Sequence, residues 1–349
     1  MKGGQPLVFF VSYGNLSSVG SPTVHFIRER VIVVKVSLLA YDGTPGHPIE
    51  DSLHCQIVDY GNRQYLREQG YILTNAGLSA KVIAAVADGV SAPYAEGSNE
   101  FPLRYYDFKD DVITGGALVA QLVTRGISEF AQHVCLEQAV INANKSVRAV
   151  LRNYFLHRFT IDDAGTLPGA AFAAVKAGDS EVEIVQCGDS LAFIELKNGN
   201  LFVTPNGNEV SDQDFVTKFA RCLSYANGDR NLAWQAHVPT VVATRRANTN
   251  VQGSPLAYCC LNGQEAVASM LYSRVFPRTD VRCVLLVTDG MLPDLLVCPQ
   301  DKLARTVMET IDEGGLAALH ERAIRLEQRH VPAHVGGITE KTAVLIAFD

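Results

Sequence analysis

The chain has 349 residues, of which 47% are hydrophobic, and this is enough apolar material for a substantial core. Its formal net charge of −7 argues against binding nucleic acid through a basic face. The first apolar segment, residues 6–11, is too short for a secretory h-region, and no stretch approaches the length of a membrane span. We therefore expect a cytoplasmic protein with no nucleic-acid or membrane partner.

The eight cysteines are scattered along the chain, and no pair has the two-residue spacing of a zinc site. Most of them lie inside apolar runs, as Cys283 does. We expect small buried residues in a reducing compartment and no disulfide bond.

The first elements in chain order are β-like. Residues 31–41 are rich in Val and Leu and predict a strand, which turn residues end. A short polar segment with two adjacent carboxylates follows, at Glu50 and Asp51. Residues 56–80 show no clear period and are expected to be an excursion from the core.

The stretch at residues 81–90 is an apolar run of strand length with β-branched residues, and it ends in Asp88-Gly89. This pattern predicts a strand that is buried on both faces. Apolar residues at helical spacing then predict two long helices, at residues 114–134 and 136–157, which would cover one face of a sheet.

Strands are expected again at residues 169–175 and 181–188. Two further apolar segments, at residues 191–196 and 201–203, bracket Asn198-Gly199, which is a strong hairpin signal. Residues 205–255 are polar and weakly patterned, and their pattern predicts no particular element.

The last third of the chain predicts one short helix, two strands and a helix pair. The short helix is expected at residues 266–272. A second buried strand, at residues 282–291, ends in Asp289-Gly290. Two helices at residues 300–312 and 314–328 precede a final buried strand at residues 342–348.

Each of two buried strands ends in a carboxylate, Asp88 or Asp289. If these strand ends lie together, two negative charges meet at the edge of a rigid sheet. Such a pair favours a divalent cation. No repeat or linker divides the chain, so we predict a single α+β domain over residues 1–349.

The order of these motifs resembles that of the metal-dependent protein phosphatases of type 2C. The segments that carry the resemblance are Glu50-Asp51, Val86–Val90, Pro168–Phe172, Gln186–Ser190, Asn198–Pro205, Val287–Gly290 and Thr339–Val344. The resemblance implies two packed, mainly antiparallel sheets flanked by pairs of helices, with family-divergent insertions at residues 56–80 and 205–255. It also implies hydrolysis of phosphoserine or phosphothreonine in a phosphorylated protein substrate.

In this family two Mg²⁺ or Mn²⁺ ions activate a bridging water. The resemblance implies that Asp88 bridges the ions, that the Gly89 carbonyl binds one of them and that Asp289 binds the other. Glu50 and Asp51 would hold metal-bound waters or orient the ligands. Asp189 would help to hold a third ion.

Several positions depart from the family pattern. Gly169-Ala170-Ala171 lacks the usual hydroxyls and Leu191 replaces the usual arginine, which we expect to affect packing more than chemistry. Two other departures concern the chemistry of the site. Thr339 stands where the family has its last aspartate ligand, and either the Glu340 carboxylate or a water would fill that place. Gly46 stands where the family commonly has an arginine that grips the substrate phosphate, and His47 or a distant arginine such as Arg104 would have to replace it.

These departures leave two other hypotheses open beside the protein phosphatase. One is a pseudophosphatase that keeps the fold and acts as a binding or regulatory module. The other is an enzyme that hydrolyses a small phosphorylated metabolite at the same site.

Overall fold

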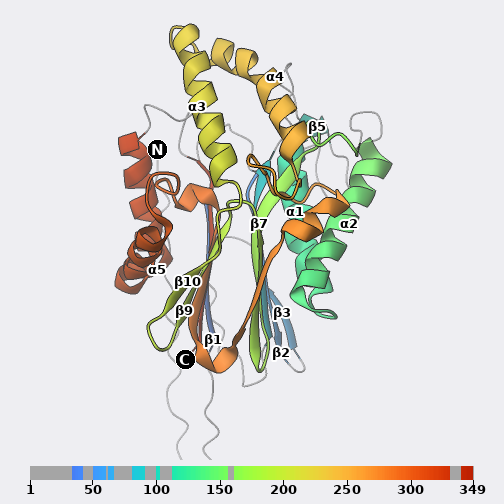
Figure 1. The fold of residues 1–349 in the computed structure, drawn as a ribbon. Helices are drawn as coiled ribbons and strands as arrows, with labels where there is room; N and C mark the ends of the chain where they lie inside the picture. The colour runs from blue at the N-terminus through green and yellow to red at the C-terminus, as the bar shows by residue number, and fades with distance from the viewer. Residues whose placement is uncertain are drawn as a thin grey trace, which may run out of the picture.

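The computed structural model describes residues 34–41, 50–59, 62–66, 81–90, 100–102, 112–155, 161–330 and 339–348. Two β-sheets pack face to face at the centre, and helices lie on both outer faces (Figure 1). Every strand pair in these sheets is antiparallel.

The first sheet has five strands, in the spatial order β1 (Val34–Tyr41), β13 (Lys341–Phe348), β12 (Val281–Val287), β9 (Leu191–Leu196) and β10 (Leu201–Val203). The second sheet has six strands, in the order β11 (Tyr272–Pro277), β8 (Glu181–Cys187), β7 (Gly169–Ala177), β4 (Lys81–Val90), β2 (Ser52–Asp59) and β3 (Asn62–Leu66). A separate two-stranded ribbon consists of β5 (Glu100–Pro102) and β6 (Val112–Thr114). The hairpin predicted around Asn198-Gly199 is confirmed as β9 and β10.

Helices α1 (Gly115–Phe130) and α2 (Leu136–Phe155) cover the outer face of the six-stranded sheet. Helix α5 (Gln300–His330) covers the five-stranded sheet and breaks at Gly314 and Gly315, so the predicted pair of helices is confirmed. The predicted architecture of two antiparallel sheets between pairs of helices is therefore confirmed.

Two more helices, α3 (Glu209–Tyr225) and α4 (Arg230–Asn248), rise above the ends of the sheets (Figure 1). Three short 3₁₀ helices complete the described chain: η1 (Glu265–Met270), η2 (Arg278–Asp280) and η3 (Asp289–Met291). Among the described helices, none is both long and apolar enough to cross a lipid bilayer.

Strand β4 shows why an uninterrupted apolar run forms a central strand here. Side chains alternate across a strand, so Ile83 and Ala85 pack toward α1 and α2, whereas Val82 and Ala84 pack toward the other sheet. Both faces of the strand are buried, as its sequence predicts.

Three segments differ from their predictions. The segment predicted as an excursion, residues 56–80, contains the end of β2 and the whole of β3, which pair at the edge of the six-stranded sheet. Residues 60–61 and 67–80 of that segment lie outside the described residues. Residues 205–255, which showed no pattern, contain α3 and α4. These two helices pack mainly against each other above the sheets, so neither needs a strong apolar face. The helix predicted at residues 266–272 is a 3₁₀ helix that gives way to β11.

Phe172 on β7 tests the packing of the layer between the sheet and the helices. Its side chain is fully buried against α1 and α2. We expect Phe172→Ala to lower the free energy of unfolding by about 3–5 kcal/mol, since the cavity that it leaves cannot close. Urea denaturation followed by circular dichroism measures this. Val275→Ala on the exposed side of β11 should cost under about 0.5 kcal/mol, and equal losses in the two variants would contradict the packing described.

Candidate functional site

Asp88 and Asp289 lie together, although the two sheets supply them separately. Asp88 is near the end of β4, and Asp289 directly follows β12 at the start of η3. The two carboxyl groups share a hydrogen bond, and the charge of Asp289 acts on Asp88. The structure therefore brings together the two carboxylates that the Asp-Gly motifs predicted as partners.

Asp51 is linked to this pair by hydrogen bonds between segments that are far apart in the sequence. The hydroxyl of Thr288, one residue before Asp289, donates to the Asp51 carboxylate at 2.8 Å. The same hydroxyl accepts from the backbone N–H of Thr342 at 3.1 Å. Thr288 thus ties Asp51 to the ends of β12 and β13.

Glu340 lies at the site with one carboxylate oxygen already engaged. Its Oε2 accepts hydrogen bonds from the backbone N–H groups of Glu50 and Asp51, at 2.7 and 2.5 Å. In this arrangement Glu340 holds the Glu50–Asp51 segment in place. Its role as a metal ligand stays a prediction.

The glycines of the two Asp-Gly motifs are required by close backbone contacts. A Cβ on Gly89 would lie 2.6 Å from the carbonyl oxygen of Glu50 and 2.5 Å from the backbone of Gly116. A Cβ on Gly290 would lie 1.8 Å from the carbonyl oxygen of Glu340. The glycines therefore let the segments that carry Glu50 and Glu340 approach the two aspartates.

Asp189 follows β8 in a turn that begins at Gly188, whose φ is +84°. This backbone is left-handed, and a Cβ added to Gly188 would lie only 2.8 Å from the carbonyl oxygen of Cys259. Only glycine therefore fits at this position. The Asp189 side chain is only 9% exposed, and among the described residues its Oδ1 has no hydrogen-bond partner. This unpaired oxygen lies beside Asp289 in one cleft.

The expectation of no disulfide is wrong, because Cys187 and Cys259 are bonded to each other directly beside this turn. Their separation of 72 residues hides the pair in the sequence. A backbone pairing between Ala170 and Leu261 places the Cys259 segment along the start of β7, where Cys187 of β8 pairs with Phe172.

Asp212 is a site residue that the sequence pattern did not reveal. It lies in the first turn of α3 and lines a cleft of about 300 Å³ together with Asp189 and Asp289. The lining of this cleft also includes apolar residues, namely Phe215, Val216, Leu292, Pro293 and Leu295. Asp212 stood in an unpatterned segment, so no motif pointed to it.

Thr339 lines the same cleft as Asp289, and Glu327 of α5 holds its polar groups through contacts that the sequence also did not reveal. Its backbone N–H donates to Glu327 of α5 at 2.9 Å, and its hydroxyl donates to the same oxygen. Lys341, which is fully buried, forms an ion pair of 2.6 Å with the other oxygen of Glu327. The charges of Asp289 and Asp51 also act on Lys341, so a buried cation lies beside the carboxylates.

The predicted phosphate-gripping positions, Gly46, His47 and Arg104, lie outside the described residues. Their place relative to the carboxylates stays a prediction.

Burial and mutual repulsion make the carboxylates hard to ionise. Burial, followed by the charge of Asp289, raises the pKa of Asp88 well above its usual range. Burial and the charge of Glu340 raise the pKa of Asp51 to about 8. Burial and the charge of Asp289 raise the pKa of Asp189 to about 7. Such a cluster stores electrostatic repulsion that protons or cations relieve.

Asp212 shares this environment. Burial, and then the charges of Asp189 and Asp289, raise its pKa to about 9, while Arg245 acts in the opposite direction. The negative field of the cluster therefore extends to α3.

The donor set suits hard divalent cations. Every side chain at the site that we consider a ligand is a carboxylate, and Mg²⁺ is commonly held by one or two carboxylates together with waters. The unpaired, buried Oδ1 of Asp189 is an oxygen donor of the kind that such an ion prefers. In the part of the chain that the structure describes, no three His, Cys, Asp or Glu side chains converge as a ready-made ligand set. A bound ion would therefore keep several waters.

The comparison with solved structures identifies the fold. Over 90% of this chain and 95% of the other, it matches the serine/threonine phosphatase Stp1 from Staphylococcus aureus, with 12% identity and a TM-score of 0.50. The Mycobacterium tuberculosis phosphatase PstP/Ppp has 16% identity over 90% of this chain and 98% of the other, with a TM-score of 0.46. The serine-threonine phosphatase 2C from Toxoplasma gondii has 15% identity over 91% and 95%, with a TM-score of 0.47.

We base the fold assignment on the Staphylococcus aureus structure. The chain has the fold of the type 2C serine/threonine phosphatases, and the resemblance predicted from its motifs is confirmed at this level. No protein-family model matches the chain, and no curated protein matches it in sequence.

Gly290 allows a test of the contact between η3 and Glu340. We expect Gly290→Ala to lower the free energy of unfolding by about 1–3 kcal/mol, because the Glu340 backbone must move to make room for the methyl group. Chemical denaturation measures the loss. Gly178→Ala is the matched control, since its Cβ would meet nothing closer than 3.8 Å. An equal effect of the two substitutions would refute the close contact.

Asp189 should make the metal-free protein less stable as the pH rises from about 4 to about 7. Its pKa is raised in the folded state, so in this window the folded protein holds a proton that the unfolded chain has lost. Urea denaturation in EDTA at several pH values should show a steeper loss of stability for the wild type than for Asp189→Asn. Identical slopes would contradict the raised pKa.

Proposed function

We propose that the protein is a metal-dependent phosphatase that hydrolyses phosphoserine or phosphothreonine in phosphorylated proteins. One observation carries this proposal: Asp88 and Asp289 meet at the ends of strands from two different sheets, with Asp51 and Asp189 beside them. The fold shared with the Staphylococcus aureus serine/threonine phosphatase supports the same reaction class.

The residues of the chain have distinct parts in this proposal. Asp88 and Asp289 would hold Mg²⁺ or Mn²⁺ through their carboxylates, with the Gly89 carbonyl as a further ligand. When bound, the ions supply the positive charge that a phosphate monoester needs and lower the pKa of a coordinated water. Asp189 would hold a third ion through its unpaired oxygen.

Other residues keep these ligands in position. Thr288 orients Asp51 through its hydroxyl, and Glu340 fixes the backbone of Glu50 and Asp51. Such outer hydrogen bonds set the direction in which a carboxylate presents its oxygens. The apolar residues around Phe215 limit water in the cleft and strengthen the electrostatic interactions there.

The alternative is a protein that keeps the fold but acts as a binding module without turnover. The surroundings of Thr339 favour this alternative, because its hydroxyl is committed to Glu327 and brings no carboxylate to the site. The buried ammonium of Lys341 also supplies positive charge close to Asp289 and Asp51. Metal-dependent turnover distinguishes the two functions.

The proposed function predicts that purified protein hydrolyses p-nitrophenyl phosphate and a phosphothreonine peptide in Mn²⁺ and is inactive in EDTA. Asp88→Asn should reduce kcat/KM by a factor of about 10² or more, since it removes a carboxylate that would hold the ions. Asp162→Asn, at an exposed aspartate far from the carboxylates in the chain, should leave the rate unchanged. A folded wild type that is inert in both Mn²⁺ and Mg²⁺ would favour the binding module instead.

A further inference from the structure

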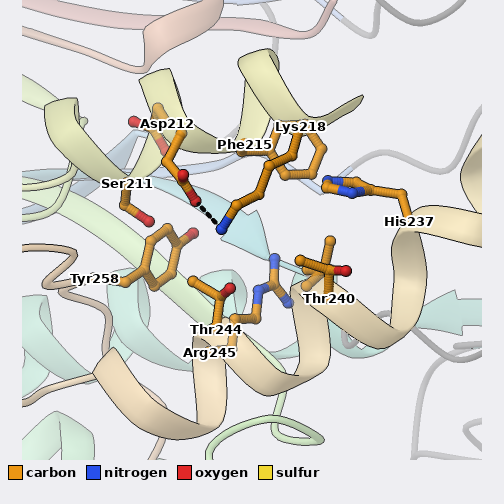
Figure 2. Close-up of a pocket in the computed structure, with 11 residues that line it drawn as sticks. Ser211, Asp212, Phe215, Lys218, His237, Thr240, Thr244, Arg245 and Tyr258 are labelled. Atoms are coloured by element: carbon orange, nitrogen blue, oxygen red, sulfur yellow. Dashed lines mark ion pairs between the residues drawn. The ribbon is translucent and has the colours of Figure 1, made fainter. Parts of the chain in front are cut away.

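Helices α3 and α4 enclose a cavity of about 190 Å³ between them (Figure 2). Four side chains of one aromatic cluster hold the helices together: Phe215 and Phe219 from α3, and Trp234 and His237 from α4. The cavity lies next to this cluster. Its lining continues to Ser211 at the start of α3 and to Arg245 near the end of α4.

The aromatic packing does not explain why a histidine, with two polar ring nitrogens, is buried at position 237. It is 1% exposed, and within the described chain neither of its ring nitrogens has a hydrogen-bond partner. Its ring lies 5.0 Å from that of Phe215 and projects from α4 toward α3 (Figure 2). A buried imidazole with two unmet polar atoms is costly, and a ligand that hydrogen bonds to one of them would relieve part of that cost.

The remaining lining combines polar groups with flat apolar walls. Ser211, Thr240 and Thr244 contribute hydroxyl-bearing side chains to the lining (Figure 2). The rings of Phe215 and Tyr258 belong to the same lining. Hydrogen-bonding groups around an aromatic lining match a ligand with a polar edge and a flat apolar face.

Charge and volume narrow the ligand class further. Lys218 forms an ion pair of 2.7 Å with Asp214, so a carboxylate of the lining already neutralises this cation and no anionic ligand is needed for it. An apolar cavity of about 150 Å³ holds a benzene molecule, so this larger space admits a somewhat larger ring system.

We propose that the cavity between α3 and α4 binds an uncharged, planar heteroaromatic molecule of nucleobase size, which hydrogen bonds to His237. This site is separate from the carboxylate cleft but adjoins it, because Asp212 lines both. The start of α3 is also tied to the Asp189 turn, since Gly207 donates to the Gly188 carbonyl at 2.9 Å. A ligand here would therefore lie beside the cleft without occupying it.

Trp234 provides a direct readout of this site. It is the only tryptophan in the chain, and its ring lies 6.4 Å from that of His237. We would titrate the full chain with adenine, hypoxanthine, cytosine and uracil, follow the tryptophan fluorescence and confirm the stoichiometry by calorimetry. No metal or phosphorylated substrate is needed, so failure of the proposed phosphatase activity would not affect this result.

We expect at least one of the four probes to bind saturably at one equivalent. His237→Phe keeps the aromatic packing but removes both nitrogens, and it should weaken binding at least tenfold. Thr244→Val, which removes one hydroxyl, should weaken binding less and serves as a second variant if His237→Phe does not fold.

His320→Phe is the matched control, because His320 is a partly buried histidine on α5 that packs against Tyr41, outside the cavity. It should leave probe binding unchanged. The proposal is overturned if none of the four probes binds saturably, or if folded His237→Phe binds as tightly as the wild type.

Discussion

Repulsion between buried carboxylates is the constraint on which the rest of this structure depends. Asp88 and Asp289 share a hydrogen bond, and Asp51 and Asp189 add their charges to the same small volume. A fold gains no stability from such a cluster, because each carboxylate raises the pKa of its neighbours. A site of this kind is favourable only when protons or cations neutralise it, which is why we interpret it as functional.

The surrounding structure holds these charges in place at fixed points. Glu340 accepts two backbone hydrogen bonds from the Glu50–Asp51 segment, and Thr288 links Asp51 to β13. Gly290 lets the Glu340 backbone pass at a distance that excludes any side chain. The Glu50–Asp51 segment and the adjoining ends of β12 and β13 are therefore tied together beside the carboxylates.

The sequence predicted the parts of this structure whose signals are local. An apolar run followed by Asp-Gly predicted both strand ends at Asp88 and Asp289, and the order of motifs predicted the two-sheet architecture. The remaining features depend on contacts between distant segments. Asp212 lies in a helix with no strong apolar pattern, and the bond between Cys187 and Cys259 depends on a backbone pairing far along the chain.

Crystals of the protein grown with MnCl₂ would test the central claim most directly, through an anomalous difference map recorded at the manganese edge. The account predicts two strong peaks between Asp88 and Asp289, within coordination distance of their carboxylate oxygens. A map of the same crystals with no peak at these two aspartates, and with their carboxyl groups still hydrogen bonded to each other, would contradict the account.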